Sequence, residues 1–263
     1  MSLLTVDRLT VEVAGRTLIR NLSLAIEPGQ RWCLLGNNGA GKTRLLETLV
    51  GLHAPASGRI LLEGRPLAEW PGHERARRIG LMPQHEEDPF PLPVAEAVAQ
   101  GAHPWHPDPL GLAPLPSAVR ERLDHAMLRM ELEGLAGRNL QTLSGGERRR
   151  VTAAMLLVQS PRIFLLDEPT NHLDLRHRER LLAPFVQATQ EGHALVVVTH
   201  DLNLAEQLAT HVLLVHDDGI CERGPRSELL REVPLQRLFE TRLAVCRNAR
   251  GERIWYVQAR PTP

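Results

Sequence analysis

The sequence predicts an α/β fold. It consists of a parallel sheet flanked by helices, an antiparallel strand region near the N-terminus and a mainly helical insert in the middle. Two observations predict it. A compact apolar run ends in a glycine-rich loop that precedes a helical pattern, and apolar runs of strand length alternate with helical patterns in the last third of the chain. At 263 residues, the chain can bury a full core in one large domain or two closely joined ones.

The N-terminal part of the chain predicts antiparallel strands followed by a strand, a loop and a helix. Residues 3–26 alternate apolar and polar side chains in short runs, with turn residues at 14–16 and 28–29, which is typical of a sheet with one face in solvent. The apolar run at 32–35 predicts a buried strand. The next helix is indicated by leucines at helical spacing after residue 43, namely Leu45, Leu49 and Leu52.

The middle of the chain predicts two strands and then helices. Residues 60–62 and 79–82 are strand-like, whereas the span 83–116 holds nine of the 20 prolines and predicts a loop broken by one helix near 94–100. Ser117 is expected to cap a further helix, and another helix follows residue 146. The buried stripe of the helix after Ser117 is predicted to be Val119, Leu123, Met127 and Met130.

The last third of the chain returns to strands. Residues 163–166, 195–198 and 212–215 are strand-like runs, the first two separated by a helical pattern, and this alternation predicts a parallel sheet. The tail is expected to form a small appendix with a hairpin turning at 248–251. The sequence therefore predicts four segments, at 1–84, 85–160 (the helical insert), 161–232 and 233–263.

Composition excludes some classes of protein. Lys plus Arg and Asp plus Glu both number 31, and this balance argues against a nucleic-acid partner. We expect no membrane span, because no apolar run approaches the roughly 20 residues that a bilayer needs, and no signal peptide. The three scattered cysteines predict buried thiols in a reducing cytosol.

The glycine-rich loop at 36–43 predicts a triphosphate site. Backbone N–H groups that converge at the N-terminus of a helix bind phosphate oxygens, and glycines let the backbone approach closely. Lys42 is expected to contact the β- and γ-phosphates, and Thr43 to coordinate Mg²⁺. The loop consists of Gly36, Asn37, Asn38, Gly39, Ala40, Gly41, Lys42 and Thr43.

Polar residues follow three of the predicted strands, at the sheet edge where α/β proteins bind ligands. Asp167 is the expected partner of Mg²⁺, and Glu168 is placed to accept a proton from the attacking water. Gln84 follows the strand 79–82 and is expected to reach Mg²⁺ or water. His200 follows the strand 195–198 and is expected to contact the γ-phosphate or orient the water.

A second anion site is predicted at Leu143-Ser144-Gly145-Gly146-Glu147, where a Gly-Gly turn opens a helix. The charge run Arg148-Arg149-Arg150 that follows is interpreted as a solvated helix face. His103 and His106, in the proline-rich span, are interpreted as loop residues because no acidic or Cys ligand accompanies them.

These motifs, in this order, make the chain resemble the ATP-binding subunit of ATP-binding-cassette (ABC) transporters over roughly residues 3–235. The resemblance implies a P-loop NTPase core of the RecA-like type, with an antiparallel β subdomain and a helical subdomain that carries the signature motif. In family terms, 36–43 is similar to the Walker A loop, Gln84 to the Q-loop, 143–147 to the signature, 163–167 to Walker B, Glu168 to the catalytic glutamate, 171–174 to the D-loop and His200 to the switch histidine.

The resemblance further implies a head-to-tail homodimer that binds ATP and Mg²⁺. Ser144, Gly145 and Gly146 of one copy would contact the γ-phosphate held by Lys42 of the other copy, and Asp174 of the D-loop would lie at the same nucleotide. The implied partners are permease subunits and, indirectly, a substrate-binding protein. The implied location is the cytoplasmic face of the inner membrane, as a peripheral subunit.

The chain departs from the family at the adenine contact. The family places an aromatic residue near positions 13–14, where this chain has Val13 and Ala14. Adenine would then pack only on aliphatic groups, which predicts weak selectivity between ATP and GTP.

A single cassette without a membrane segment favours an importer subunit. The stretches 101–104, 170–174 and 200–205 resemble importers of iron-siderophore, haem and cobalamin, and cobalamin or an iron chelate ranks ahead of haem as the cargo. Two alternatives are an exporter subunit and a soluble cassette ATPase that acts on ribosomes or DNA.

Overall fold

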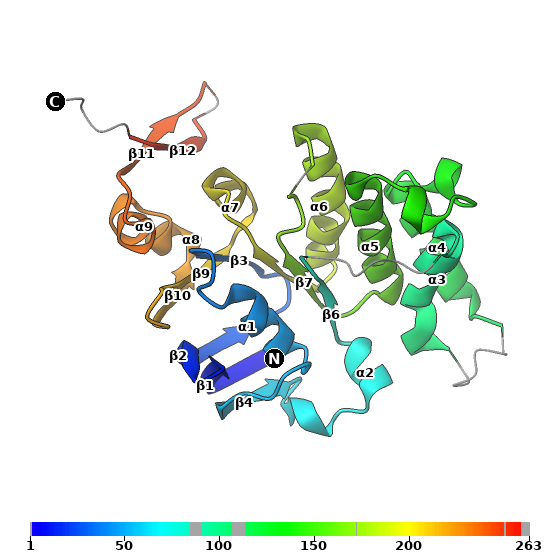
Figure 1. The fold of residues 1–263 in the computed structure, drawn as a ribbon, viewed down its shortest axis with the longest axis horizontal. Helices are drawn as coiled ribbons and strands as arrows, with labels where there is room; N and C mark the ends of the chain where they lie inside the picture. Colours follow the sequence, from blue (N-terminus) through cyan, green and yellow to red (C-terminus); the bar gives the residue numbers. More distant parts are fainter. Residues whose placement is uncertain (1, 85–90, 107–113, 172, 250, 259–263) are drawn as a thin grey trace. The chain divides into compact units, whose positions relative to one another are not determined.

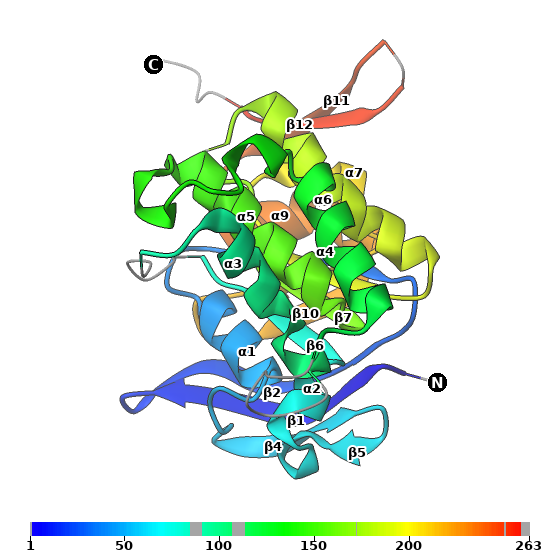
Figure 2. The same cartoon turned by 90° about the vertical axis from the view of Figure 1, so that its right-hand side faces the viewer.

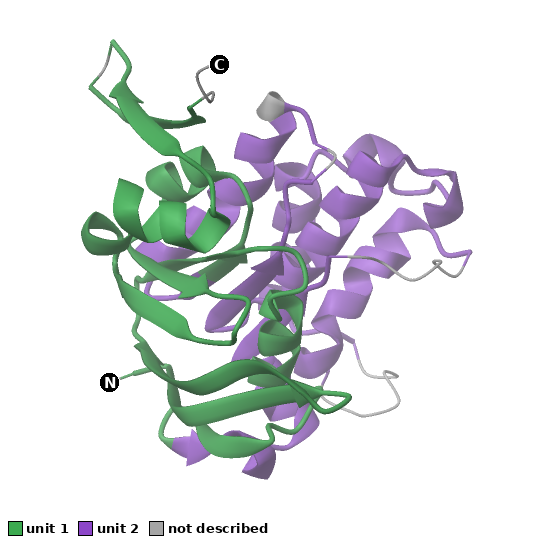
Figure 3. Ribbon diagram, turned by 60° about the vertical axis from the view of Figure 1, so that its left-hand side comes forward, with its two compact units in different colours: residues 1–64, 196–263 green, residues 65–195 purple. Residues whose placement is uncertain are grey.

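The structure, a computed structural model, describes residues 2–84, 91–106, 114–171, 173–249 and 251–258. For residues 175 and 176 it describes the backbone alone. Parts of the proline-rich span and His172 of the D-loop stretch therefore lie outside the described residues. The chain divides into two compact units, unit 1 with residues 1–64 and 196–263 and unit 2 with residues 65–195 (Figure 3).

The antiparallel region of unit 1 is built around strand β1 (Leu4–Val13) (Figure 1). It pairs with β2 (Arg16–Ile26) on one side and with β4 (Ser57–Leu62) on the other. The turn between β1 and β2 puts Ala14 and Gly15 at positive φ, 48° and 80°. The buried residues of β1 alternate as the sequence pattern predicts, with one shift between Val6 and Leu9, where the pairing with β2 is irregular.

The parallel core of unit 1 contains β3 (Arg31–Gly36) and β9 (His211–Val215), which pair in parallel. Strand β10 (Cys221–Pro225) adds an antiparallel edge to β9. The chain enters unit 1 within β8 (Ala194–Val198), and the Thr199 N–H after it donates to the Leu34 carbonyl of β3 at 3.2 Å. The carboxyl ends of β3 and β8 are therefore neighbours.

Helix α1 (Lys42–Leu49) follows β3 and is shorter than predicted. Gly51 has φ 81°, a left-handed conformation that ends helices, so the predicted helix does not reach Leu52, which is 63% exposed. Helix α7 (Leu202–Leu208) follows β8.

Unit 2 contains a pair of parallel strands and the helical insert. Strands β6 (Ile79–Met82) and β7 (Ile163–Asp167) pair in parallel, and the Ala194 N–H at the start of β8 donates to the Arg162 carbonyl just before β7. Helix α5 (Gly145–Gln159) packs against α3 (Val94–Ala99), α4 (Ser117–Arg129) and α6 (Leu175–Gln190) (Figure 2). The short elements are β5 (Arg65–Pro66), η1 (Leu67–Glu69), α2 (Gly72–Ala76), η2 (Gln100–Trp105), η3 (Glu133–Leu135) and η4 (Leu140–Thr142).

One predicted cap in unit 2 is wrong. The residue that caps α4 is Pro116, and Ser117 is already the first helical residue, with no capping hydrogen bond from a described side chain. The backbone of Pro116, at φ −54° and ψ 145°, sets the entry to the helix instead. Val119, Met127 and Met130 are buried as predicted, while Leu123 is half-buried.

The C-terminal part of unit 1 consists of α8 (Arg226–Leu229), α9 (Glu232–Phe239) and a hairpin of β11 (Leu243–Arg247) and β12 (Arg253–Val257). The hairpin is the one that the sequence predicts. It attaches to α7 through Asn203, whose side chain pairs with both backbone groups of Trp255, and through Glu206, whose carboxylate accepts from Trp255 Nε1 at 2.9 Å. Trp255 is only 4% exposed.

None of the described helices combines the length and the apolar character that crossing a bilayer requires.

Candidate functional site

The phosphate loop lies between β3 and α1 in unit 1. Lys42 is 5% exposed, and its Nζ donates to the carbonyls of Gly36 (2.9 Å) and Asn37 (2.8 Å), so the loop curls around the ammonium group. Gly41 begins α1 in the left-handed region at φ 99°. Within the described residues, no side chain caps the first turn of α1, which leaves its N–H groups facing the loop for an anion.

Two glycines of the loop are required by close packing. A Cβ on Gly36 would lie 2.5 Å from the Val215 carbonyl oxygen, and one on Gly41 would lie 2.7 Å from Leu18 Cβ. Gly41 would also be strained in any other residue because of its positive φ. The loop can therefore pack against these neighbours only with glycine at the two positions.

His200 lies at the same sheet edge as the loop. It follows Thr199, whose N–H contacts β3 next to the start of the loop, and it precedes α7. Asp201 caps that helix by accepting from the N–H groups of Asn203 (2.9 Å) and Leu204 (3.1 Å). Unit 1 therefore brings the predicted phosphate loop and the predicted switch histidine to neighbouring strand ends.

Asp167 and Glu168 stand at the carboxyl end of β7 in unit 2. Asp167 is the last residue of the strand and is 1% exposed. Glu168 is 9% exposed, and its Oε2 accepts a hydrogen bond from Gln84 Nε2 at 2.9 Å. Because Gln84 follows β6, the parallel neighbour of β7, unit 2 brings together the three residues predicted from separate stretches of sequence.

Asn171 is a polar partner of Glu168 that sequence reasoning missed. Its Nδ2 also donates to Glu168 Oε2. The signal was present, since Asn171 lies three residues after Glu168 in the stretch singled out as D-loop. Two side-chain amides thus hold the one carboxylate, which fixes its direction.

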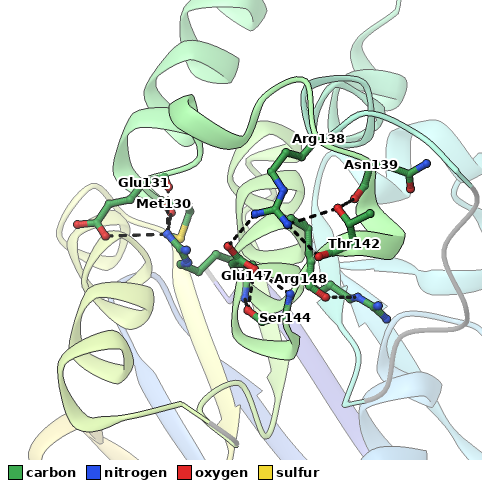
Figure 4. Close-up of polar contacts among 10 residues, drawn as sticks. Met130, Glu131, Arg138, Asn139, Thr142, Ser144, Glu147 and Arg148 are labelled. Atoms are coloured by element: carbon green, nitrogen blue, oxygen red, sulfur yellow. Dashed lines mark hydrogen bonds and ion pairs between the residues drawn. The ribbon is translucent and has the colours of Figure 1, made fainter.

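The signature turn forms a capping box at the start of α5. Ser144 Oγ accepts from the Glu147 N–H at 3.3 Å, and Glu147 Oε2 accepts from the Ser144 N–H and hydroxyl, both at 2.8 Å. Arg138 lies 3.7 Å from the same carboxylate, and Figure 4 shows these contacts. The backbone and then the side-chain hydrogen bond of Ser144 lower the pKa of Glu147 below its ordinary value.

A pocket of about 410 Å³ opens beside this turn. The predicted D-loop residue Asp174 lines it and caps α6 by accepting from the His177 N–H at 2.9 Å. The predicted phosphate contacts of the signature and Asp174 therefore share one pocket in unit 2. Its lining residues are Ser144, Gly145, Gly146, Glu147, Arg150, Leu173, Asp174 and His177.

The interpretation of residues 148–150 as a solvated face is wrong for Arg149, which is 7% exposed. In a helix, Arg149 shares a face with residues four and seven positions later, and Ala153 and Leu156 are both buried. The helical spacing could have identified Arg149 as a buried residue. We interpreted the three consecutive charges as exposed instead.

Comparison with known proteins finds a matching family and similar relatives. The family model described as ABC transporter matches residues 19–171. The hemin import ATP-binding protein HmuV of Streptomyces coelicolor is 37% identical over 239 residues, which cover 88% of this chain and 81% of that protein. The ferric enterobactin transport ATP-binding protein FepC of Escherichia coli is 34% identical and covers 91% and 88%.

The fold comparison agrees. A chain from the structure of an inward-facing ABC transporter superposes with a TM-score of 0.81 at 25% identity, covering 98% of this chain and 97% of that chain.

Proposed function

Because the chain belongs to the ABC transporter family, we propose that it is the ATP-hydrolysing subunit of an importer that takes up a metal chelate through a membrane permease. Family membership makes it a nucleotide-binding protein and an ATPase coupled to transport. The observation that carries the catalytic part of the proposal is the buried Glu168 carboxylate, which directly follows Asp167 and is held by Gln84 and Asn171.

In the proposed mechanism, the loop at 36–43 binds the phosphates through its N–H groups and through Lys42. Asp167, Thr43 and Gln84 would supply oxygen atoms, the donors that Mg²⁺ prefers, and the ion, when bound, would neutralise charge on the phosphates. Glu168 accepts a proton from the attacking water, while His200 contacts the γ-phosphate or orients that water.

The signature turn serves a second copy of the chain in this proposal. Ser144, Gly145 and Gly146 contact the γ-phosphate held by Lys42 of the partner copy, and Asp174 lies at the same nucleotide. The pocket beside the turn supports this, because Ser144, Gly145 and Gly146 line it at the start of α5. ATP would then join two copies head to tail, and hydrolysis would release them.

The remaining partners follow from the family. ABC import ATPases work with membrane permease components, so we place this chain peripherally at the cytoplasmic face of the inner membrane, bound to its permease and coupled indirectly to a substrate-binding protein. We propose no nucleic-acid partner, given the balanced charge.

The proposed cargo is haem or a ferric siderophore. The relatives named above carry hemin and ferric enterobactin in their names, and those names give no support to ranking cobalamin ahead of haem. Uptake of labelled haem, ferric siderophore and cobalamin by iron-starved cells, with the intact gene or with Lys42→Ala, tests the cargo. Loss of cobalamin uptake alone would contradict this choice.

A phosphate-release assay on the full-length chain tests the catalytic proposal. General-base catalysis contributes roughly 10²–10⁴ in rate, so we expect Glu168→Gln to lower turnover by about that factor while ATP binding persists. Glu191→Gln, at an exposed position after α6, is the matched control and should keep full turnover. Turnover of Glu168→Gln within about twofold of the wild type would contradict the assignment.

A further inference from the structure

Arg149 carries a buried charge that the proposed mechanism does not use. It lies in the second turn of α5 and is 7% exposed. A buried guanidinium is costly unless each N–H finds an acceptor. Its surroundings should therefore show which part of the molecule requires it.

The acceptors of Arg149 are backbone carbonyls from two separate loops. The guanidinium has five N–H groups in a planar fork, and five carbonyl oxygens accept from its three nitrogens. Nη1 donates to Pro83 and to Gln84 (3.2 Å), Nη2 donates to Asp167 (2.6 Å) and Glu168 (3.0 Å), and Nε donates to Pro169 (3.2 Å).

The two loops are those that carry Gln84 and Glu168. Glu168 has φ 47°, a left-handed conformation that is strained for a residue with a side chain. Such a conformation persists where its surroundings hold it, and Arg149 holds the carbonyls of residues 167–169 around it. The same guanidinium also holds the backbone of Gln84, whose amide donates to the Glu168 carboxylate.

We propose that Arg149 is a positioning residue for Glu168: it fixes the backbone on both sides of the Gln84–Glu168 hydrogen bond and so aims the carboxylate. The proposal rests on the role of Glu168 as the general base. Arg149 donates hydrogen bonds to backbone carbonyls of the loop that carries Glu168. It would therefore contribute to catalysis by holding the geometry of that loop. A displacement of about 1 Å in a reacting group can cost on the order of 100-fold in rate.

The test compares single-turnover phosphate release, ATP affinity and thermal unfolding of the full-length chain. We expect Arg149→Gln to lower the hydrolysis rate by about 10- to 100-fold while ATP affinity stays within about threefold, because the phosphate loop is unchanged. Arg149→Lys keeps the charge but places all its donors on one nitrogen, so it should restore only part of the rate.

Arg77→Gln is the matched control. Arg77 also donates to a backbone carbonyl, that of Pro104, at 2.7 Å, and it stacks on Trp105 at 4.8 Å. Its loss should lower the unfolding temperature with the rate per folded molecule unchanged. If Arg149→Gln likewise lowers only the unfolding temperature, Arg149 is structural and the proposal is wrong.

A double-mutant cycle separates this proposal from the role of Glu168 itself. If Arg149 acts through Glu168, adding Arg149→Gln to Glu168→Gln should change the residual rate by less than about twofold. Equal losses in both backgrounds would overturn the positioning role and leave the general base intact. A Glu168→Gln variant with full activity would instead overturn the proposed function.

Discussion

At the scale of single residues, Ser144 and Glu147 satisfy each other's polar groups at the start of α5. Folding lowers the pKa of Glu147 below its ordinary value of 4.5, so the ionised carboxylate is the form that the fold stabilises. Its contribution to stability is complete above pH 4.5 and is lost as the pH falls through the lower pKa of the folded state. The signature turn therefore weakens in acid.

Glu147→Ala and Glu147→Gln test this electrostatic contribution. Loss of a capping interaction costs roughly 0.5–2 kcal/mol, so Glu147→Ala should lower the free energy of unfolding by about that amount at neutral pH. The difference from the wild type should shrink below pH 4.5, whereas the difference between Gln and Ala should not depend on pH. Urea titrations across the acidic range measure both. A difference between wild type and Ala that is constant with pH would contradict the stabilised carboxylate.

The residues expected to contact the adenine ring predict poor discrimination between ATP and GTP. Val13 ends β1 half-buried, and Ala14 is exposed in the turn that follows. Competition binding should give affinities for ATP and GTP within about tenfold, which is about 1.4 kcal/mol. Val13→Tyr offers a stacking surface for the nucleotide base, so this variant should prefer ATP to GTP more strongly than the wild type does. A wild-type preference well above tenfold would contradict the aliphatic contact.

At the scale of elements, the strands of the parallel sheet were predictable from the sequence, and an edge strand was not. Apolar runs identified β3, β7 and β8, because strands buried on both faces read as continuous apolar sequence. Strand β10 was missed, since its sequence Cys-Glu-Arg-Gly-Pro shows no apolar run and its place comes from pairing with β9. A strand that is defined by its pairing with another strand cannot be predicted from its own sequence alone.

The candidate site divides in the same way. The residues of the loop, the acids, Gln84 and His200 could be located from strand ends in the sequence, because ligands bind at that edge of α/β sheets. The carbonyl contacts of Arg149 could not, because they depend on the left-handed turn at Glu168.

The C-terminal hairpin makes a prediction about element stability. Trp255 attaches the hairpin to α7 through its buried ring and through its indole N–H on Glu206. Trp255→Ala should lower the free energy of unfolding by about 3–5 kcal/mol, and Trp255→Phe by about 1–3 kcal/mol because only the polar contact and part of the ring are lost. Urea denaturation measures both. Two variants as stable as the wild type would show that the hairpin does not dock on α7.

At the scale of the whole molecule, the proposed function depends on two copies of the chain that share nucleotides. We predict that the signature pocket and the phosphate loop each bind phosphate, and a head-to-tail pair would place one against the other at each ATP. The free energy of binding ATP would then stabilise the dimer, so the chain should dimerise when ATP is bound and dissociate when it is absent.

Sedimentation of the Glu168→Gln chain with and without ATP tests this claim most directly. We expect hydrolysis to be slow in this variant, and therefore a dimer when ATP and Mg²⁺ are present and a monomer when they are absent. Glu168→Gln combined with Lys42→Ala should stay monomeric in both conditions. A Glu168→Gln chain that binds ATP yet sediments as a monomer would contradict the shared-nucleotide dimer.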